Sequence, residues 1–420
     1  MRNDLTLRPF PVIGMAQDFV GSNNINLLVP SGQFGTRMTG GSDAASARYI
    51  FTQLSPLARC LFPEEDDVLL TLREDDGQLV EPLFFCPVIP LLVVNGSHGI
   101  GTGWSTFIPK YNPRDVVAFI RAKLDSSKEL PPIRPWVRGF TGEIVPAKNG
   151  AGFTSFGVAE IMDSQTVHIS ELPIGKWTSD YKKRLLKMMN KGDILSFAEN
   201  HTTTTVSFTV KMNPIVLDRF EKQGIHKAFK LQTYLYTTNM NAFNYKGAIE
   251  QFDSAESMAE AHFPVRLSLY YDRKSVLESD MNYRATMMRN KARFIGAVVD
   301  KQIELIGTTR KTRAETIAKL NELEFCDAAR LKEIRNSNNI AEPCLHDFTG
   351  DTEGKGNDAK HDFDYLLNMP LSSLTSEMID SLYRDAEKNE IELAQLIKTT
   401  PEDLWSKDLD KLESHLESYF

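Results

Sequence analysis

The stretch GGSDAASARYIFTQLSPLARCLF, residues 40–62, changes from small polar residues to an apolar pattern near its centre. Its apolar residues Ile50, Leu54, Leu57 and Leu61 follow one another at steps of four, three and four. Such steps place side chains on one face of a helix. The sequence therefore predicts a helix through residues 45–61, with Tyr49 in its first turns.

Arg48 and Tyr49 form a pair whose residue types suit phosphate chemistry. A tyrosine hydroxyl has a pKa of about 10, so it is a weak nucleophile near neutral pH until a neighbour assists it. A guanidinium can hold two oxygens of a phosphate in its planar fork and stabilise the charge of the transition state. Taken alone, the dipeptide more often reflects a buried tyrosine beside a surface arginine.

The bulk composition is that of a soluble globular protein. At roughly 100–200 residues per domain, a chain of 420 residues predicts two to four domains. The longest apolar run, PVIPLLVV at residues 87–94, is far shorter than the ~20 residues of a membrane helix, and MRNDLTLRPF lacks the apolar core of a signal peptide. We therefore expect no membrane partner.

The four cysteines, Cys60, Cys86, Cys326 and Cys344, form no C-x-x-C pair, so we expect neither a structural zinc nor a disulfide framework. A reducing compartment fits this pattern. The net charge of −8 argues against nucleic-acid binding only if the charges are evenly spread. They are not, because residues 34–59 carry three arginines against a single acid, Asp43.

The rest of the chain shows mixed elements. Strands are predicted at TVHISEL (166–172) and TTTTVSFTVKM (202–212), with a helix at TSDYKKRLLKMMN (178–190) between them. Residues 265 to about 335 are predicted to be long and helical, with a weak coiled-coil seam from Leu277 to Ile303. A glycine-rich stretch, 346–362, predicts a mobile loop. Helical periodicity then resumes, and Thr400-Pro401-Glu402-Asp403 has the form of a helix start. Together these patterns predict an antiparallel helical hairpin with a small knob at its far end.

Residues 16–63 also contain the motifs FVGSNN, GQFGTR and RYIFT in order. With NGSHGIGTGWS, ISELP, HKAFKLQT and LLNMPLSSLT further on, the chain resembles eukaryotic type II DNA topoisomerases from about residue 12 to its end. The resemblance implies a mixed α+β multidomain fold. It comprises a partial winged-helix DNA-binding domain at 1–85, a tower-like α/β domain at 86–264, and coiled-coil arms with a C-terminal dimerisation gate at 265–420.

The resemblance also implies roles for individual residues. Tyr49 would form a transient 5′-phosphotyrosyl link to DNA, and Arg48 would neutralise the scissile phosphate. Other motif residues would touch the cleaved duplex or support the site: Gln17, Asn23, Asn24, Gln33 and Arg37. For Asn23 and Asn24, ordinary capping of loop backbone is an equal alternative.

Ile100 lies in NGSHGIGTGW, which has neither of the common glycine-rich phosphate-binding patterns. In the family this element carries an apolar wedge, and Ile100 occupies the matching position. A β-branched side chain flanked by Gly99 and Gly101 can approach a base step closely, unstack it and bend the duplex.

The partners and cofactors also follow from the resemblance. The chain would act on double-stranded DNA as a homodimer. Mg²⁺ and ATP would serve the whole enzyme, with neither site expected in this chain, and a separate chain could supply the Toprim and ATPase domains. The nucleus is the expected compartment, and a mitochondrial or other organelle matrix is the alternative. Two other interpretations stay open: a catalytically silent module that bends DNA and dimerises, and a helical scaffold that binds no nucleic acid.

Overall fold

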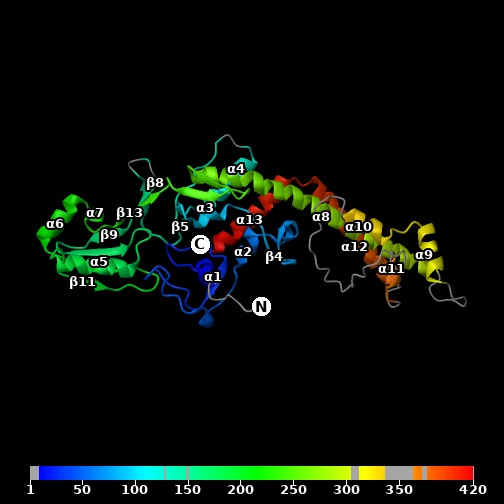
Figure 1. Ribbon diagram of the computed structural model, residues 1–420, viewed down its shortest axis with the longest axis horizontal. Helices are drawn as coiled ribbons and strands as arrows, with labels where there is room; N and C mark the ends of the chain where they lie inside the picture. The colour runs from blue at the N-terminus through cyan, green and yellow to red at the C-terminus, as the bar shows by residue number, and fades with distance from the viewer. Residues whose placement is uncertain are drawn as a thin grey trace. The chain divides into compact units, whose positions relative to one another are not determined.

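The computed structural model describes residues 9–126, 129–147, 150, 152–303, 312–335, 363–370 and 376–419 (Figure 1). The chain divides into two compact units. Unit 1 consists of Met1–Pro63, Cys86–Arg266 and Ser406–Phe420, and unit 2 consists of Glu64–Phe85 and Leu267–Trp405. Two long helices, α8 (Ala255–Val299) and α13 (Pro401–Tyr419), have residues in both.

Unit 1 begins with short elements around the predicted active-site segment. They are α1 (Pro9–Ala16), β1 (Leu28–Ser31), the 3-10 turn η1 (Ala47–Tyr49), β2 (Phe51–Leu54) and α2 (Pro56–Leu61). The strands β1 and β2 pair antiparallel, from Leu28 opposite Leu54 to Ser31 opposite Phe51. The helix predicted over residues 45–61 is therefore wrong in its first two-thirds.

The reason for this error lies at Ser55 and Pro56. The Ser55 hydroxyl accepts the backbone N–H of Leu57, and Pro56 stands at the first helical position. A serine N-cap followed by proline is a helix start, so the helix begins here and not at residue 45. Upstream of it, Ile50 and Leu54 belong to extended backbone whose hydrophobic spacing resembles that of a helix by coincidence.

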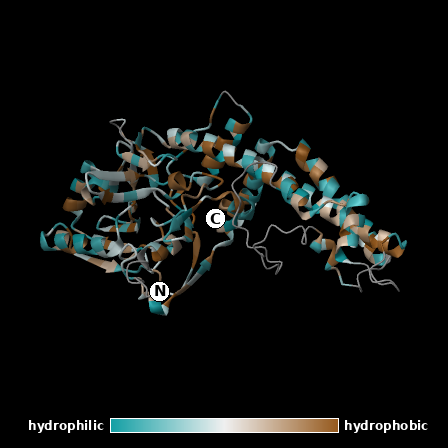
Figure 2. Cartoon of the chain, turned by 45° about the vertical axis from the view of Figure 1, so that its right-hand side comes forward, coloured by the Kyte–Doolittle hydropathy of each residue, from teal (hydrophilic) through white to brown (hydrophobic). Residues whose placement is uncertain are grey.

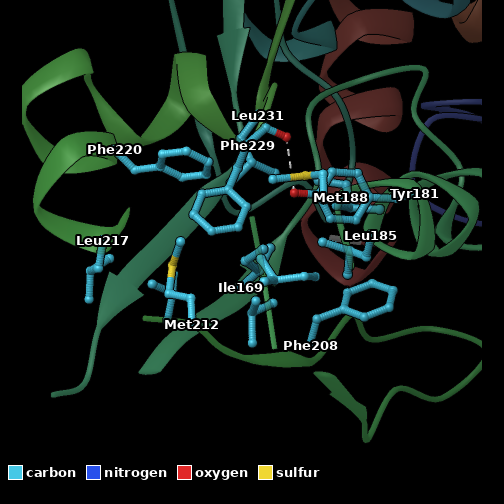
Figure 3. Packing of buried hydrophobic residues seen from close by; sticks show 14 of the residues in the cluster. Ile169, Tyr181, Leu185, Met188, Phe208, Met212, Leu217, Phe220, Phe229 and Leu231 are labelled. Atoms are coloured by element: carbon cyan, nitrogen blue, oxygen red, sulfur yellow. Dashed lines mark hydrogen bonds between the residues drawn. The ribbon is translucent and has the colours of Figure 1, made fainter. Parts of the chain in front are cut away.

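A four-stranded antiparallel sheet forms the main core of unit 1. Its strands are β9 (Val158–Ile161), β10 (Thr166–Glu171), β11 (Ser196–Glu199) and β12 (Phe208–Lys211), in the order β11-β12-β10-β9. Helix α5 (Thr178–Asn190) packs Tyr181, Leu185 and Met188 onto it (Figure 3). Helices α6 (Pro214–Gln223) and α7 (Ile225–Ala228) complete the cluster. The predicted strand–helix–strand order is confirmed, although the second strand is shorter than residues 202–212.

The remaining sheets of unit 1 are small. One contains β7 (Glu143–Pro146), β8 (Gly152–Phe156) and β13 (Gln232–Tyr236), in the order β13-β8-β7. Two hairpins complete the strands: β5 (Ser97–Gly101) with β6 (Trp104–Ile108), and β14 (Met240–Phe243) with β15 (Ile249–Phe252). Two more helices, α3 (Leu91–Asn95) and α4 (Pro113–Leu124), lie close to them in sequence. Helices α4 and α6 each begin with asparagine as N-cap followed by proline.

Unit 2 is mostly helical. It contains η2 (Glu64–Leu69), the hairpin of β3 (Leu72–Asp75) and β4 (Gln78–Pro82), α9 (Arg313–Glu322), α10 (Ala328–Arg335), α11 (Asp364–Leu367) and α12 (Ser376–Lys398). Helices α8 and α12 run antiparallel, because Lys274 contacts Ile397 whereas Arg289 pairs with Glu390 at 2.7 Å. Both helices carry hydrophilic and hydrophobic residues along their length (Figure 2).

A second core lies at the end of this helical hairpin, around Phe294, Leu320, Phe325, Phe363 and Leu366. The predicted hairpin with a knob is confirmed. The predicted helix start at Thr400 is also confirmed, since Thr400 and Asp403 exchange backbone and side-chain hydrogen bonds at 2.9 and 3.1 Å. The continuous helical region predicted over 265–335 is wrong in its bounds, because α8 begins at Ala255 and ends at Val299. The loop predicted at 346–362 lies outside the described residues.

A membrane-spanning helix or a metal site within the described residues would be recognised by its length, hydropathy or side chains. None of the helices there combines the length and hydropathy of a membrane span. Three or more His, Cys, Asp or Glu side chains do not gather anywhere in the described ranges in a way that could hold a metal ion.

Candidate active site

Tyr49 ends the short turn η1 and stands out from the surface. Its backbone N–H bonds to the carbonyl of Ser46 at 2.9 Å, and Ile50 then returns the chain to extended geometry. The side chain is 70% exposed, so its hydroxyl is open to an incoming group. The guanidinium carbon of Arg48 lies 5.3 Å from the centre of the Tyr49 ring. A cation and a phenol are thus held together at the surface of unit 1.

The loop before Tyr49 is organised by Asp43. Its carboxylate accepts hydrogen bonds from the backbone N–H of Thr36 at 2.9 Å, the Thr36 hydroxyl at 2.6 Å and the Thr39 hydroxyl at 2.7 Å. Burial alone would raise the pKa of this carboxyl, but the hydrogen bonds from Thr36 and Thr39 outweigh it and lower the pKa below its ordinary value. Asp43 therefore acts as an ionised anchor that fixes the loop leading to the tyrosine.

Two glycines let this loop approach the rest of the unit. A Cβ atom at Gly40 would lie 2.3 Å from the Trp177 ring, and one at Gly41 would lie 2.4 Å from the side-chain nitrogen of Gln17. Both glycines also have positive φ, at 67° and 88°. The loop therefore requires glycine at both positions, for space and for backbone geometry.

Gln17, Asn23 and Asn24 bond to backbone. The Gln17 amide donates to the carbonyl of Phe34 at 2.9 Å, and Asn23 donates to the carbonyls of Gly14 and Gln17 at the end of α1. Asn24 is fully buried. Its amide nitrogen donates to three carbonyls, those of Val94, Tyr111 and Trp136, and its oxygen accepts the backbone N–H of Arg138.

Arg37 is buried as well and pairs with the equally buried carboxylate of Glu171 at the end of β10. Its other terminal nitrogen bonds to the carbonyl of Thr204 at 3.3 Å. Gln33 differs from Arg37, because it is exposed and its backbone carbonyl accepts the N–H of Ala45 at 2.9 Å. Of the polar residues in these motifs, Gln33 thus faces solvent, whereas Asn24 and Arg37 lie inside the fold.

Ile100 occupies the end of the β5–β6 hairpin and is 88% exposed. Trp104 follows across a turn in which Gly103 has a φ of +79°, and the indole is 54% exposed. Two large apolar side chains, both largely exposed, therefore project from one hairpin end.

This hairpin is braced along β6 by β14. The backbone N–H of Phe107 donates to the carbonyl of Asn239 at 2.8 Å, and the Thr106 hydroxyl donates to the carbonyl of Asn241 at 2.7 Å. The Asn241 amide returns a bond of 2.9 Å to the carbonyl of Ser105. These three bonds, together with the side-chain bond from Asn239 to Ser105, fix the direction in which Ile100 points.

Comparisons with known proteins decide the family. The family model for the A-type subunits of DNA gyrase and topoisomerase IV matches residues 11–410. The chain belongs to this family. It is 39% identical to DNA topoisomerase 2 of Arabidopsis thaliana over 97% of its length, and 37% identical to the DNA topoisomerase-like protein cin-4 of Caenorhabditis elegans.

The chain spans only part of these topoisomerase relatives, 28% of the Arabidopsis protein and 51% of cin-4. Among solved structures, it is similar to the DNA-binding, cleavage and re-ligation domain of Plasmodium falciparum topoisomerase II. The two have a TM-score of 0.85 and 38% identity over 97% of this chain and 54% of that one. The predicted family and the mixed α+β fold are confirmed.

Several residues that hold this candidate site together could not be predicted from local sequence. Glu171, Trp177 and Arg138 all come from segments more than a hundred residues beyond the motifs they contact. Asp43 alone had a local signal, since it is the one acid among three arginines in residues 34–59.

The Mg²⁺ ion implied by the family does not fit the described residues around Tyr49. The one carboxylate in the preceding loop, Asp43, already bonds to Thr36 and Thr39 through its two oxygens.

Proposed function

We propose that the chain is the breakage-reunion portion of a type II DNA topoisomerase. The observation that carries the proposal is the exposed Tyr49 phenol with the Arg48 guanidinium beside it on the turn η1. A nucleophile that attacks a phosphate within a duplex needs access from solvent and a cation near the developing charge. The pair satisfies both needs.

In the proposed reaction, the Tyr49 hydroxyl loses its proton and its oxygen attacks a backbone phosphorus. A new bond forms between phosphorus and the tyrosyl oxygen, and the bond from phosphorus to the 3′-oxygen breaks, so a 3′-hydroxyl leaves after taking up a proton. Arg48 stabilises the charge on the phosphoryl oxygens. Since one phosphodiester replaces another, the reverse attack by the 3′-hydroxyl reseals the strand without ATP.

The other motif residues take two roles in this proposal. Gln33 contacts the duplex, because its side chain faces solvent. Gln17, Asn23, Asn24 and Arg37 support the site by fixing the loop and the end of α1. Ile100 enters the duplex as an apolar wedge and bends it, with the cost of unstacking offset by added contacts.

The assembly and cofactors are proposed from the family. Two copies place two Tyr49 residues across one duplex, and a second duplex passes through the double-strand break. Mg²⁺ and ATP serve the whole enzyme from sites outside the described residues, on a Toprim and ATPase portion that a separate chain can supply. The nucleus is the proposed compartment, as the relatives are eukaryotic DNA topoisomerases.

A covalent-adduct assay tests the central step. The chain is incubated with end-labelled duplex, Mg²⁺ and a separately expressed Toprim fragment, then denatured and run on a gel. We expect a labelled protein band that disappears in Tyr49→Phe, while duplex affinity changes by less than about threefold. Tyr245→Phe, which alters another exposed tyrosine, should keep the band. A band that persists in Tyr49→Phe excludes this residue, and DNA binding without any band indicates a silent bending module.

A further inference from the structure

Helix α5 and the residue after it carry five cationic side chains, and these divide into two groups. Lys182 pairs with Glu199 at 2.7 Å, and Lys183 pairs with Asp180 at 2.9 Å. The other three are Arg184, Lys187 and Lys191, and their side chains have neither an ion pair nor a hydrogen bond within the described part of the chain. Positive charge is therefore left uncompensated on one part of the helix.

These three cations share a face and a pocket. Their steps of three and four residues place them one above another along the helix. All three line one pocket of about 380 Å³, together with Asn190 and Asp193. Its apolar lining comes from Met188, Phe220 and Ala228. Met188 and Phe220 also belong to the core cluster, so this wall is rigid (Figure 3).

The pocket has a buried donor that lacks an acceptor. The Nε of Arg184 is shielded from solvent and has no hydrogen-bond partner among the described residues. Buried N–H groups are rarely left in this state. The one carboxylate of the pocket, Asp193, is already engaged by Arg219 at 3.2 Å. An acceptor from outside the described residues would therefore complete this group, and the uncompensated charge favours an anion.

We propose that this pocket binds a phosphate group. A phosphate offers several acceptor oxygens and the charge that a guanidinium and two ammonium groups bind well. The volume lies within the range of small-ligand pockets, and the apolar wall suits the organic part of a small phosphorylated molecule. A backbone phosphate of a duplex carries the same chemistry. The pocket does not depend on Tyr49 or on strand cleavage.

The test compares two pairs of lysines from helix α5 and the residue that follows it. Calorimetric titration of the full chain with pyrophosphate, and separately with a 40-base-pair duplex, is repeated with Lys187→Gln/Lys191→Gln. The matched control is Lys182→Gln/Lys183→Gln, which removes the same charge from already paired positions. We expect the first variant to weaken phosphate binding about tenfold or more, and the control by less than about twofold.

The two ligands distinguish the sources of the phosphate. Loss of pyrophosphate binding in the Lys187/Lys191 variant alone supports a small phosphorylated ligand. A loss of duplex binding alone, with pyrophosphate binding unchanged, supports a backbone phosphate of DNA as the ligand. Equal losses in both variants, or binding of neither ligand by the wild-type chain, would overturn the proposal and leave a solvated basic face. A chain that binds pyrophosphate but gives no Tyr49 adduct would retain the pocket and lose the cleavage function.

Discussion

At the scale of single residues, the motif positions fall into a buried group and an exposed group. Asn24 and Arg37 are inside the fold, where irregular backbone and a buried carboxylate need hydrogen-bond partners, whereas Tyr49, Ile100 and Gln33 are exposed. A buried polar group without a partner costs about 1–3 kcal/mol of folding stability. Replacing a supporting residue can therefore damage the site as much as replacing a reacting one. Residue type alone therefore does not distinguish a residue that touches the ligand from one that holds the loop.

His262 on α8 gives a prediction of pH dependence. Burial, together with the nearby charge of Arg266, lowers the pKa of this histidine to about 4, although its Nε2 donates to the carbonyl of Pro87 at 2.9 Å. The unfolded chain, with a histidine pKa near 6.5, binds this proton more readily. His262 thus contributes stability fully above pH ~6.5 and loses it as the pH falls toward 4. Between pH 7.5 and 5 we expect a loss of about 2 kcal/mol from this residue.

Urea unfolding at the two pH values measures this loss. His262→Gln keeps an amide donor near the Nε2 position and removes the titration, so its free energy of unfolding should fall by about 2 kcal/mol less than that of the wild type over the same interval. His415→Gln, which alters a partly exposed histidine, is the control. Parallel pH profiles for all three proteins would contradict the prediction, because they would show that the pKa of His262 is the same in the folded and unfolded chains.

At the scale of elements, the helices that could be predicted are those with a clear local signal in the sequence, either a long amphipathic spacing or capping residues. The amphipathic helix α5 and the Thr400 helix start needed only spacing and capping residues. The error over residues 45–61 arose because four apolar residues matched a helical spacing across the break at Ser55-Pro56. The capping dipeptide was the stronger signal, since it fixes backbone geometry directly, whereas spacing over so few residues fits a strand equally well.

The bracing of the β5–β6 hairpin could not be predicted, because β6 and β14 are more than 130 residues apart. Asn241→Ala removes the amide bonds to the carbonyl of Ser105 and to Asn239. We expect Ile100 to lose its fixed direction, so that a duplex with fluorophores at both ends bends less. Affinity should fall by less than about threefold, since phosphate contacts dominate binding.

Energy transfer between the two fluorophores measures this bend. Asn244→Ala is the matched control, because Asn244 bonds within its own turn and to Glu250 on the same hairpin. It should leave the bend unchanged. An Asn241→Ala protein that bends the duplex as the wild type does would mean that β5 and β6 alone orient the wedge.

At the scale of the whole molecule, unit 1 is assembled from segments that lie far apart in the chain. The C-terminal helix α13 contributes Tyr419, whose ring lies 4.8 Å from the Arg138 guanidinium, and a pair of carboxylates that bind Arg121 at 2.6 Å. No periodicity encodes such pairings, which depend on how complete elements pack. The resemblance to a family, carried by motifs distributed over the chain, anticipated the fold where local pattern did not.

The proposed homodimer predicts how two kinds of chain behave when mixed. If each chain cuts one strand, a dimer of wild type with Tyr49→Phe can only nick a duplex. After exchange of equal amounts, random pairing leaves about a quarter of dimers able to cut both strands and about half able to nick. In the presence of Mg²⁺ and a Toprim fragment, denaturant-trapped circular DNA should therefore yield more nicked than linear product. Linear product that stays at half the wild-type level, with few nicks, would mean that the cutting unit does not combine one tyrosine from each of two exchanging chains.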